Sequence, residues 1–265
     1  MDLNTIKSTA IQIIDQTRTN LLKIAQGDLQ AEKKADNSFV TRADKETELF
    51  IRKALAESFP THNILGEEFP SIDHGSPYTW VIDPIDGTHS FKHGIPLYGT
   101  MLCLLEGKTP LVSIIDLPGL NRCYAAAKGL GTTCNNMPVH LQDLASGNLI
   151  EDEVIATGER LQFDDCGLAP AFDKLMSSHR HVRTYCDCFG HTMAAEGWIG
   201  AMVDFNIRLW DCMASVLIIE EAGGKAVCVG TRKDGSQNRY DWVFGKAEVV
   251  DWVCELLDLE EVEYD

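Results

Sequence analysis

The sequence predicts an α/β protein, with an α/β second half packed on an α+β first half. A chain of 265 residues that is 45% hydrophobic is long enough to bury a full core. Residues 1–60 show apolar residues at helical spacing, and short apolar runs separated by Gly and Pro follow them. Beyond a boundary near residue 150, strand-like and helix-like segments alternate. No repeat or linker separates the two fused halves, so we expect one domain over residues 1–265.

Two amphipathic helices are expected near the start of the chain. Leu3–Ala25 carries apolar residues at helical spacing and is expected to cover a sheet. Thr41–Phe59 opens with Thr41 followed three residues later by Asp44, a variant of the capping box, and Pro60 should end this helix. The apolar face of the second helix is predicted to consist of Leu49, Phe50, Ala54 and Leu55.

The short apolar runs that follow favour β-strands in a mixed sheet. Strands are predicted at Thr79–Ile82, Gly99–Leu105 and Leu111–Leu117. In the second half the predicted order is a strand at Val154–Ala156, a polar stretch to Ser178, a helix at Phe189–Gly197, a strand at Ala201–Phe205 and a helix at Trp210–Ala222. A last strand follows Gly223-Gly224 and runs through Val229. Functional residues are expected at the ends of these strands.

The charge balance excludes two classes of partner. The chain has 23 Lys and Arg against 40 Asp and Glu, a formal net charge of -17, which would repel a nucleic-acid backbone or an anionic membrane surface. No apolar run reaches the roughly 20 residues needed to span a bilayer. An anionic substrate would need a bound divalent cation to reverse the local field. Clusters of carboxylates therefore become the informative feature.

The nine cysteines indicate a reducing compartment. They are odd in number and scattered, and they include no CxxC pair. The first residues of the chain lack the basic and apolar regions of a signal peptide. We therefore expect a cytoplasmic protein with free thiols, Cys186 and Cys188 among them.

One segment predicts a metal site. An apolar strand runs into two aspartates three residues apart, Asp83 and Asp86, with Pro84 fixing a turn between them. Such a turn can aim both carboxylates at one point. Mg²⁺ prefers carboxylate and carbonyl oxygens and retains some of its waters, and the Ile85 carbonyl is a third donor. The segment therefore favours a magnesium site.

Two other segments offer acids for the same ion. Glu67 and Glu68 follow an apolar run upstream, and Asp211 opens a predicted helix downstream. By itself Asp211 is equally well explained as a helix cap, but three carboxylate-bearing segments together point to a metal. The backbone N–H groups of Gly87 and Thr88 follow the aspartates and are placed to hold a phosphate.

Three motifs, in matching order and spacing, resemble the signature motifs of the inositol monophosphatase superfamily. They are GEE at residues 66–68, DPIDGT at residues 83–88 and WDxxAxxxIxxEAGG at residues 210–224. The resemblance spans the chain from the first helix to Gly223-Gly224. It implies a layered αβαβα sandwich, a Mg²⁺-dependent phosphate monoester hydrolase acting on a small molecule, and a homodimer.

The resemblance also assigns roles residue by residue. It implies that Gly87 and Thr88 hold the phosphate through their amides and that Glu68 lies one layer behind the metal ligands. Asp44, Thr88 and Glu67 would be catalytic, with Asp44 and Thr88 orienting and deprotonating a metal-activated water that attacks phosphorus in line. The implied Mg²⁺ ligands are Glu67, Asp83, the Ile85 carbonyl, Asp86 and Asp211.

Two features resemble the histidinol-phosphatase branch in particular. They are the Asp-Cys-aromatic run at residues 187–189 and the pattern Ser-Phe, then Gly-x-Pro-x-x-Gly-Thr, at residues 90–100. Asp187 and Asp204 would pair with a cationic leaving group, and histidinol phosphate carries an amine and a titratable imidazole. We therefore expect a histidinol-phosphate phosphatase of histidine biosynthesis.

Two alternatives remain open on the sequence. Asp187 can also be a hydrogen-bonded structural acid, and Asp204 can stand in for the Glu that contacts inositol hydroxyls in the inositol enzymes, which leaves inositol-1-monophosphatase as the second candidate. His89 departs from the Lys that histidinol-phosphatase-like sequences tend to have. The third candidate is a catalytically silent metal- or phosphoester-binding protein, although every metal carboxylate is retained.

Overall fold

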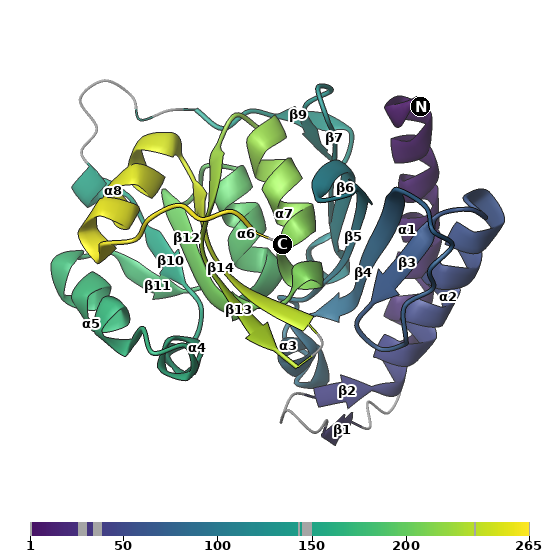
Figure 1. The fold of residues 1–265 in the computed structure, drawn as a ribbon, viewed down its shortest axis with the longest axis horizontal. Helices are drawn as coiled ribbons and strands as arrows, with labels where there is room; N and C mark the ends of the chain where they lie inside the picture. The colour runs from purple at the N-terminus through teal and green to yellow at the C-terminus, as the bar shows by residue number, and fades with distance from the viewer. Residues whose placement is uncertain are drawn as a thin grey trace.

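Five layers make up the fold, in the order helix, sheet, helix, sheet, helix (Figure 1). The computed structural model describes residues 2–25, 31–33, 39–142, 144, 150–235 and 237–264, without the side chains of 31–33 and 39–41. The layers confirm the predicted α/β class and the αβαβα sandwich. No helix in these ranges is long and apolar enough to cross a membrane.

The first outer layer consists of α1 (Leu3–Ile24) and α2 (Arg42–Ser58). The helical spacing of α1 is confirmed, since residues such as Ile6, Ala10 and Ile14 face the sheet and are buried. The predicted apolar face of α2 is confirmed at Leu55, which is fully buried, and is wrong at Leu49, which is 52% exposed. The buried face of α2 carries Ala43, Asp44, Thr47, Glu48, Ile51, Arg52 and Leu55.

The polar residues of α2 turn inward because they find partners there. The Arg52 guanidinium donates to Glu48, one turn earlier, with Nε and Oε1 2.6 Å apart, and it also donates to the Phe69 carbonyl at 2.9 Å. An ion pair that is satisfied in this way can be buried, whereas Leu49 can stay on the surface at little cost. The side of α2 that faces the protein interior therefore includes Asp44.

The first sheet follows the chain in order, with β3 and β4 parallel and the other neighbours antiparallel. Along β5 the side chains alternate: Met101 and Cys103 face the central helices, while Leu102 and Leu104 face α1 and α2. The strands are β3 (Asn63–Gly66), β4 (Tyr78–Asp86), β5 (Gly99–Glu106), β6 (Thr109–Leu117), β7 (Arg122–Ala127), β8 (Thr132–Cys134) and β9 (Met137–Val139).

The central layer consists of α6 (Asp187–Ala195) and α7 (Leu209–Glu221), which lie between the two sheets (Figure 1). Residues 212–219 of α7 are all buried, since both sheets cover this helix. Both helices agree with the predicted ones to within two residues. Because each sheet packs on α6 and α7, one core joins the two halves of the chain.

The second sheet has the order β11-β10-β12-β14-β13, and its far side is covered by α4, α5 and α8. Its strands are β10 (Ile155–Thr157), β11 (Val182–Thr184), β12 (Ala201–Ile207), β13 (Lys225–Asp234) and β14 (Gln237–Gly245). The outer helices are α4 (Arg160–Asp165), α5 (Ala169–Ser178) and α8 (Ala247–Leu257). The shorter elements are α3 (Thr88–Lys92), η1 (Pro118–Leu120), η2 (Ile150–Asp152), and a separate β1 (Ala31–Lys33) with β2 (Phe39–Thr41).

Candidate metal centre

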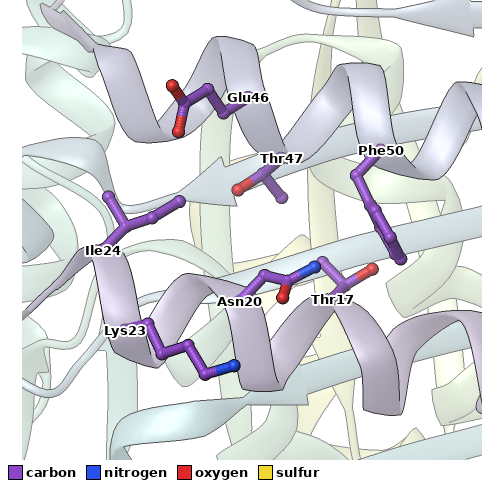
Figure 2. A pocket seen from close by; sticks show the side chains of 7 residues that line it. All are labelled: Thr17, Asn20, Lys23, Ile24, Glu46, Thr47 and Phe50. Carbon is purple, nitrogen blue, oxygen red and sulfur yellow. The ribbon is translucent and has the colours of Figure 1, made fainter.

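Two cavities of similar size differ in their chemistry. One of about 330 Å³ lies between α1 and α2 and is lined by Thr17, Asn20, Lys23, Ile24, Glu46, Thr47 and Phe50 (Figure 2). The other, of about 320 Å³, collects the predicted metal and phosphate residues and is called the acidic pocket below. It is lined by Glu67, Asp83, Ile85, Asp86, Gly87, Thr88, Gln162, Asp165, Asn206, Ile207, Arg208, Trp210, Asp211 and Arg239.

A bulge at the end of β4 brings two carboxylates to the acidic pocket. Residues an odd number of positions apart in a regular strand point to opposite faces, so Asp83 and Asp86 would diverge. The register with β5 shifts between them, with one extra residue on β4, and both carboxylates then face the same place. The Thr100 hydroxyl donates to the Pro84 carbonyl at 2.9 Å and holds the bulge. The predicted turn at Pro84 is therefore a bulge within one continuous strand.

The start of α7 supplies the third carboxylate. Asp211 Oδ2 accepts the backbone N–H of Arg208 at 2.7 Å, so this side chain caps the helix. One oxygen from each of Asp83, Asp86 and Asp211 lies within 4.8 Å of the others. A carboxylate has two oxygens, so capping and metal binding are compatible roles for Asp211.

The three carboxylates lie close together, with Asp83 and Asp86 buried and Asp211 partly buried, and this raises their pKa values. For Asp83 and Asp86 burial is the largest cause of a strong increase, and neighbouring acid charges add to it. Burial raises the pKa of Asp211 to about 6, against the opposing effect of the Arg208 N–H. Asp83 Oδ1 is buried without a hydrogen-bond partner in the described part of the chain. A hard cation such as Mg²⁺ fits this oxygen-only, negatively charged set.

Glu67 is held by the contact between α2 and the loop after β3. The Glu68 backbone N–H donates to Glu48 Oε2 at 2.7 Å. A Cβ on Gly66 would lie 2.2 Å from Glu48 Oε1, so the close approach of this carboxylate requires glycine there. Glu67 itself lines the acidic pocket. The backbone of Glu68 thus contacts Glu48, which forms an ion pair with Arg52.

Thr88 connects the metal strand to α2. Its hydroxyl lies 3.1 Å from Asp44 Oδ1 and 3.0 Å from the Ile85 carbonyl, and it donates its hydrogen to one of them at a time. Asp44 is fully buried. Gly87, with a φ of 80°, turns the chain so that the amides of Gly87 and Thr88 follow directly after the bulge. The structure therefore gathers Asp44, Gly87 and Thr88 beside the three metal-binding candidates.

Asp187 and Asp204 lie beyond this cluster, on α6 and β12. Asp187 has a φ of 61°, and a Cβ on Gly87 would lie 3.0 Å from its Oδ2, so its carboxylate lies against the predicted phosphate turn. Burial, followed by the charge of Asp204, raises the pKa of Asp187 to about 7. Asp204 is 2% exposed and accepts a hydrogen bond from His191 Nε2 at 3.0 Å. Neither acid is among the described residues that line the acidic pocket.

The acidic pocket is also lined by five polar residues that no sequence motif indicated. They are Gln162, Asp165, Asn206, Arg208 and Arg239. Arg208 Nη2 and Arg239 Nε both donate to Asp234 Oδ2, at 2.7 and 2.9 Å. Arg208 had one available signal, because it precedes Asp211 by a single helical turn. Gln162 and Arg239 reach the pocket only through the fold.

The chain is similar to known proteins over most of its length. The sequence model of the inositol monophosphatase family matches residues 2–249. The histidinol-phosphatase of Chlorobaculum parvum is 39% identical to this chain over 197 residues, which cover 74% of each of the two chains.

Solved structures share the fold over nearly the whole chain. The inositol monophosphatase from Anabaena (Nostoc) sp. has a TM-score of 0.81 and 25% identity and covers 99% of each chain. An IMPase/NADP phosphatase, described as a complex with Mg²⁺ and phosphate, has a TM-score of 0.82 and 20% identity and covers 100% of each chain.

Proposed function

Because this chain belongs to the inositol monophosphatase family, we propose that it is a Mg²⁺-dependent phosphate monoester hydrolase whose substrate is histidinol phosphate. The observation that carries the reaction class is the cluster of Asp83, Asp86 and Asp211, gathered from two separate segments. The solved relative that holds Mg²⁺ and phosphate supports the cation. The relative named histidinol-phosphatase supports the substrate.

The proposed mechanism assigns a task to each group in the pocket. Mg²⁺, when bound, neutralises the phosphate, lowers the pKa of the attacking water and stabilises the departing alkoxide. The amides of Gly87 and Thr88 hold the phosphate oxygens. The Thr88 hydroxyl accepts the proton of the attacking water while passing its own proton to Asp44. The groups that would hold the ion are Glu67, Asp83, the Ile85 carbonyl, Asp86 and Asp211.

The acids beyond the metal cluster support a cationic leaving group. Asp187 lies against Gly87, and Asp204 keeps one carboxylate oxygen free of protein partners within the described ranges. An ammonium group is the strongest partner for a buried carboxylate. The amine of histidinol phosphate would therefore be placed beside the phosphate turn, with the ester oxygen toward the metal cluster.

Inositol 1-phosphate is the second candidate, on a specific observation. The free Asp204 Oδ1 can accept a hydrogen bond from a sugar hydroxyl as well as from an amine. The solved inositol monophosphatase from Anabaena (Nostoc) sp. has the same fold. A hydroxyl gains less from a buried carboxylate than an ammonium does, so we place histidinol phosphate first.

Phosphate release from both esters, with Mg²⁺ and with a chelator, tests the proposal. We expect turnover that requires Mg²⁺ and a higher kcat/KM for histidinol phosphate. A higher kcat/KM for inositol 1-phosphate would select the second candidate. Mg²⁺ binding without phosphate release from either ester would show a catalytically silent binding protein.

The proposal includes a homodimer, which the family resemblance implies. Light scattering of the purified protein should give a mass twice that of the 29.4 kDa chain. A monomeric mass at assay concentration would remove this part of the proposal and leave the reaction class unaffected.

A further inference from the structure

A buried hydrogen-bonded chain joins three elements behind the acidic pocket. Ser215 Oγ on α7 lies 2.8 Å from His191 Nδ1 on α6, and His191 Nε2 lies 3.0 Å from Asp204 Oδ2 on β12. The three residues are at most 2% exposed. If the serine hydroxyl donates to Nδ1, then Nε2 carries the hydrogen and donates to the carboxylate. The chain fixes both the tautomer of the ring and the position of Asp204.

The second oxygen of Asp204 is left over by this arrangement. Asp204 Oδ1 is buried and has no hydrogen-bond partner in the residues that the structure describes. A carboxylate oxygen that is buried without a partner has lost its hydration with nothing to replace it, which destabilises the folded state. A purely structural acid would be expected to use both oxygens on protein groups, as Asp241 does with Arg232 and the Asn206 N–H.

The free oxygen lies near Gln162, a residue that lines the acidic pocket. A Cβ on Gly158 would be 2.8 Å from Asp204 Oδ1 and 2.1 Å from Gln162 Oε1, so these two oxygens flank the same glycine. Gln162 lines the pocket, and so does Asn206, two residues along β12 from Asp204. Gly158 allows the Gln162 and Asp204 side chains to lie this close to the backbone, since a Cβ there would clash with both oxygens.

One helix places both proposed leaving-group acids. Asp187 and His191 are four residues apart on α6 and therefore lie on the same side of it. Asp187 is part of the helix, and Asp204 is fixed to it through His191. A shift of α6 would therefore move both acids relative to the phosphate turn.

We propose that His191, supported by Ser215, is the positioning residue for Asp204. It holds one carboxylate oxygen so that the other faces the amine of the leaving alcohol. The inference rests on the proposed function, because it assigns Asp204 Oδ1 to that amine. In the proposed arrangement His191 touches neither the phosphate nor the metal ligands. Its replacement should therefore affect only recognition of the alcohol.

The test compares His191→Leu with His191→Gln, because Gln keeps an N–H donor near the position of Nε2 and Leu does not. For histidinol phosphate, we expect His191→Leu to raise KM about tenfold with kcat changed by less than about threefold. His191→Gln should recover most of this loss. His179→Leu is the matched control, because His179 is a buried histidine of the outer layer that bonds to the Glu153 carbonyl. This control should leave KM within about twofold of wild type.

A double-mutant cycle decides between positioning and a scaffold role. His191→Leu should add less than about twofold to the loss caused by Asp204→Asn, because the histidine acts through that carboxylate. Independent, multiplying losses, or an equal fall in kcat for every ester, would overturn the proposal. If His191→Leu does not fold, Ser215→Ala gives the same decision, with an expected KM increase of about threefold that vanishes in the Asp204→Asn background.

The failure of the proposed function is separate from these outcomes. It would appear in the wild-type protein, as a lower kcat/KM for histidinol phosphate than for phosphate esters of uncharged alcohols. The cycle is then measured with the ester that the wild type prefers. Coupling between His191 and Asp204 with that ester would retain the positioning role, and its absence would remove it.

Discussion

Asp83 is the residue at which the cost of burial is clearest. Its side chain is almost completely buried, one of its oxygens has no partner in the described ranges, and the charge of Glu67 adds to the increase in its pKa. Charged groups are buried in this way when a cation compensates for the lost hydration. Asp86 and Asp211 lie beside Asp83 and add negative charge, so a bound cation should stabilise the three acids as carboxylates.

Replacement of one ligand oxygen tests this unit. We expect Asp83→Asn to lower kcat/KM at least about a hundredfold and to abolish the stabilisation by Mg²⁺, because a charged ligand is lost. Phosphate release and the Mg²⁺-dependent shift in Tm measure the two effects. Glu46→Gln, which removes an acid from the groove between α1 and α2, is the control and should behave like wild type. Asp83→Asn turnover within tenfold of wild type would contradict the metal assignment.

Asp187 tests recognition of the leaving group at the same scale. We expect Asp187→Ala to lower kcat/KM for histidinol phosphate about 10–100-fold more than for the phosphate ester of an uncharged alcohol, because only the amine loses an ionic partner. Steady-state kinetics with the two esters gives the ratio. An equal loss with both esters would identify Asp187 as a structural acid at the start of α6.

At the scale of elements, the position of the site depends on irregularities in otherwise regular structure. The bulge in β4 aligns two aspartates that a regular strand would separate, and Gly87 turns the chain into α3 directly afterwards. A Cβ at Gly87 would lie 3.0 Å from both the Leu97 carbonyl oxygen and Asp187 Oδ2. The turn therefore depends on glycine for its conformation and for the approach of two neighbouring groups.

Gly87→Ala should lower both the stability of the protein and its activity. The left-handed conformation costs a non-glycine residue about 1–2 kcal/mol, which corresponds to a Tm lower by about 2–8 °C. We expect kcat/KM to fall at least about tenfold as well, because displaced amides hold the phosphate less well. Gly75→Ala is the matched control, with a φ of 68° and nothing within 4 Å of the added carbon. If Gly87→Ala loses only stability, as this control should, the phosphate role of the turn is wrong.

Elements were predictable from sequence where burial follows a simple period. The α1 helix could be placed within a residue because one apolar stripe faces the sheet. The α4 and α5 helices could not, because each buries a single side chain, Phe163 in one and Leu175 in the other. The inward face of α2 was predictable only in part, because polar residues such as Glu48 and Arg52 lie on it beside Ile51 and Leu55.

The candidate site shows the same division. Asp83, Asp86 and Asp211 could be predicted to converge, because the first two lie at the end of an apolar strand and the third lies at the start of a helix, each within a short motif. Gln162 and Arg239 belong to no motif, and only the packing of α4 and β14 around the pocket brings them there. The link from His191 to Asp204 joins a helix to a strand, and no spacing in the sequence indicates it.

At the scale of the whole molecule, the surplus of acids makes the protein dependent on pH and on its cation. The formal net charge is -17, and the most crowded acids are buried at one place. Self-repulsion of this kind destabilises the folded state as more acids ionise. A bound divalent cation acts in the opposite direction, both locally and through mass action.

The expected pH dependence follows from the sign of the pKa shifts. The pKa of Asp211 rises from 3.8 to about 6 and that of Asp187 from 3.8 to about 7 on folding. A raised folded-state pKa contributes stability below the unfolded value that is lost as pH rises through the folded value. The Tm of the metal-free protein should therefore fall between about pH 4 and pH 7, and Mg²⁺ should reduce the fall. A metal-free Tm that rises through this range would contradict the burial argument.

We propose that the acidic pocket hydrolyses the phosphate ester of a cationic alcohol. The most direct measurement is kcat/KM with Mg²⁺ for histidinol phosphate and for the same ester without its amine, 3-(imidazol-4-yl)propyl phosphate. We predict a preference of about tenfold or more for the amine-bearing ester, from one charge-assisted hydrogen bond at Asp187 or Asp204. Equal values of kcat/KM for the two esters would contradict this proposal, because Asp187 and Asp204 would then play no part in choosing the substrate.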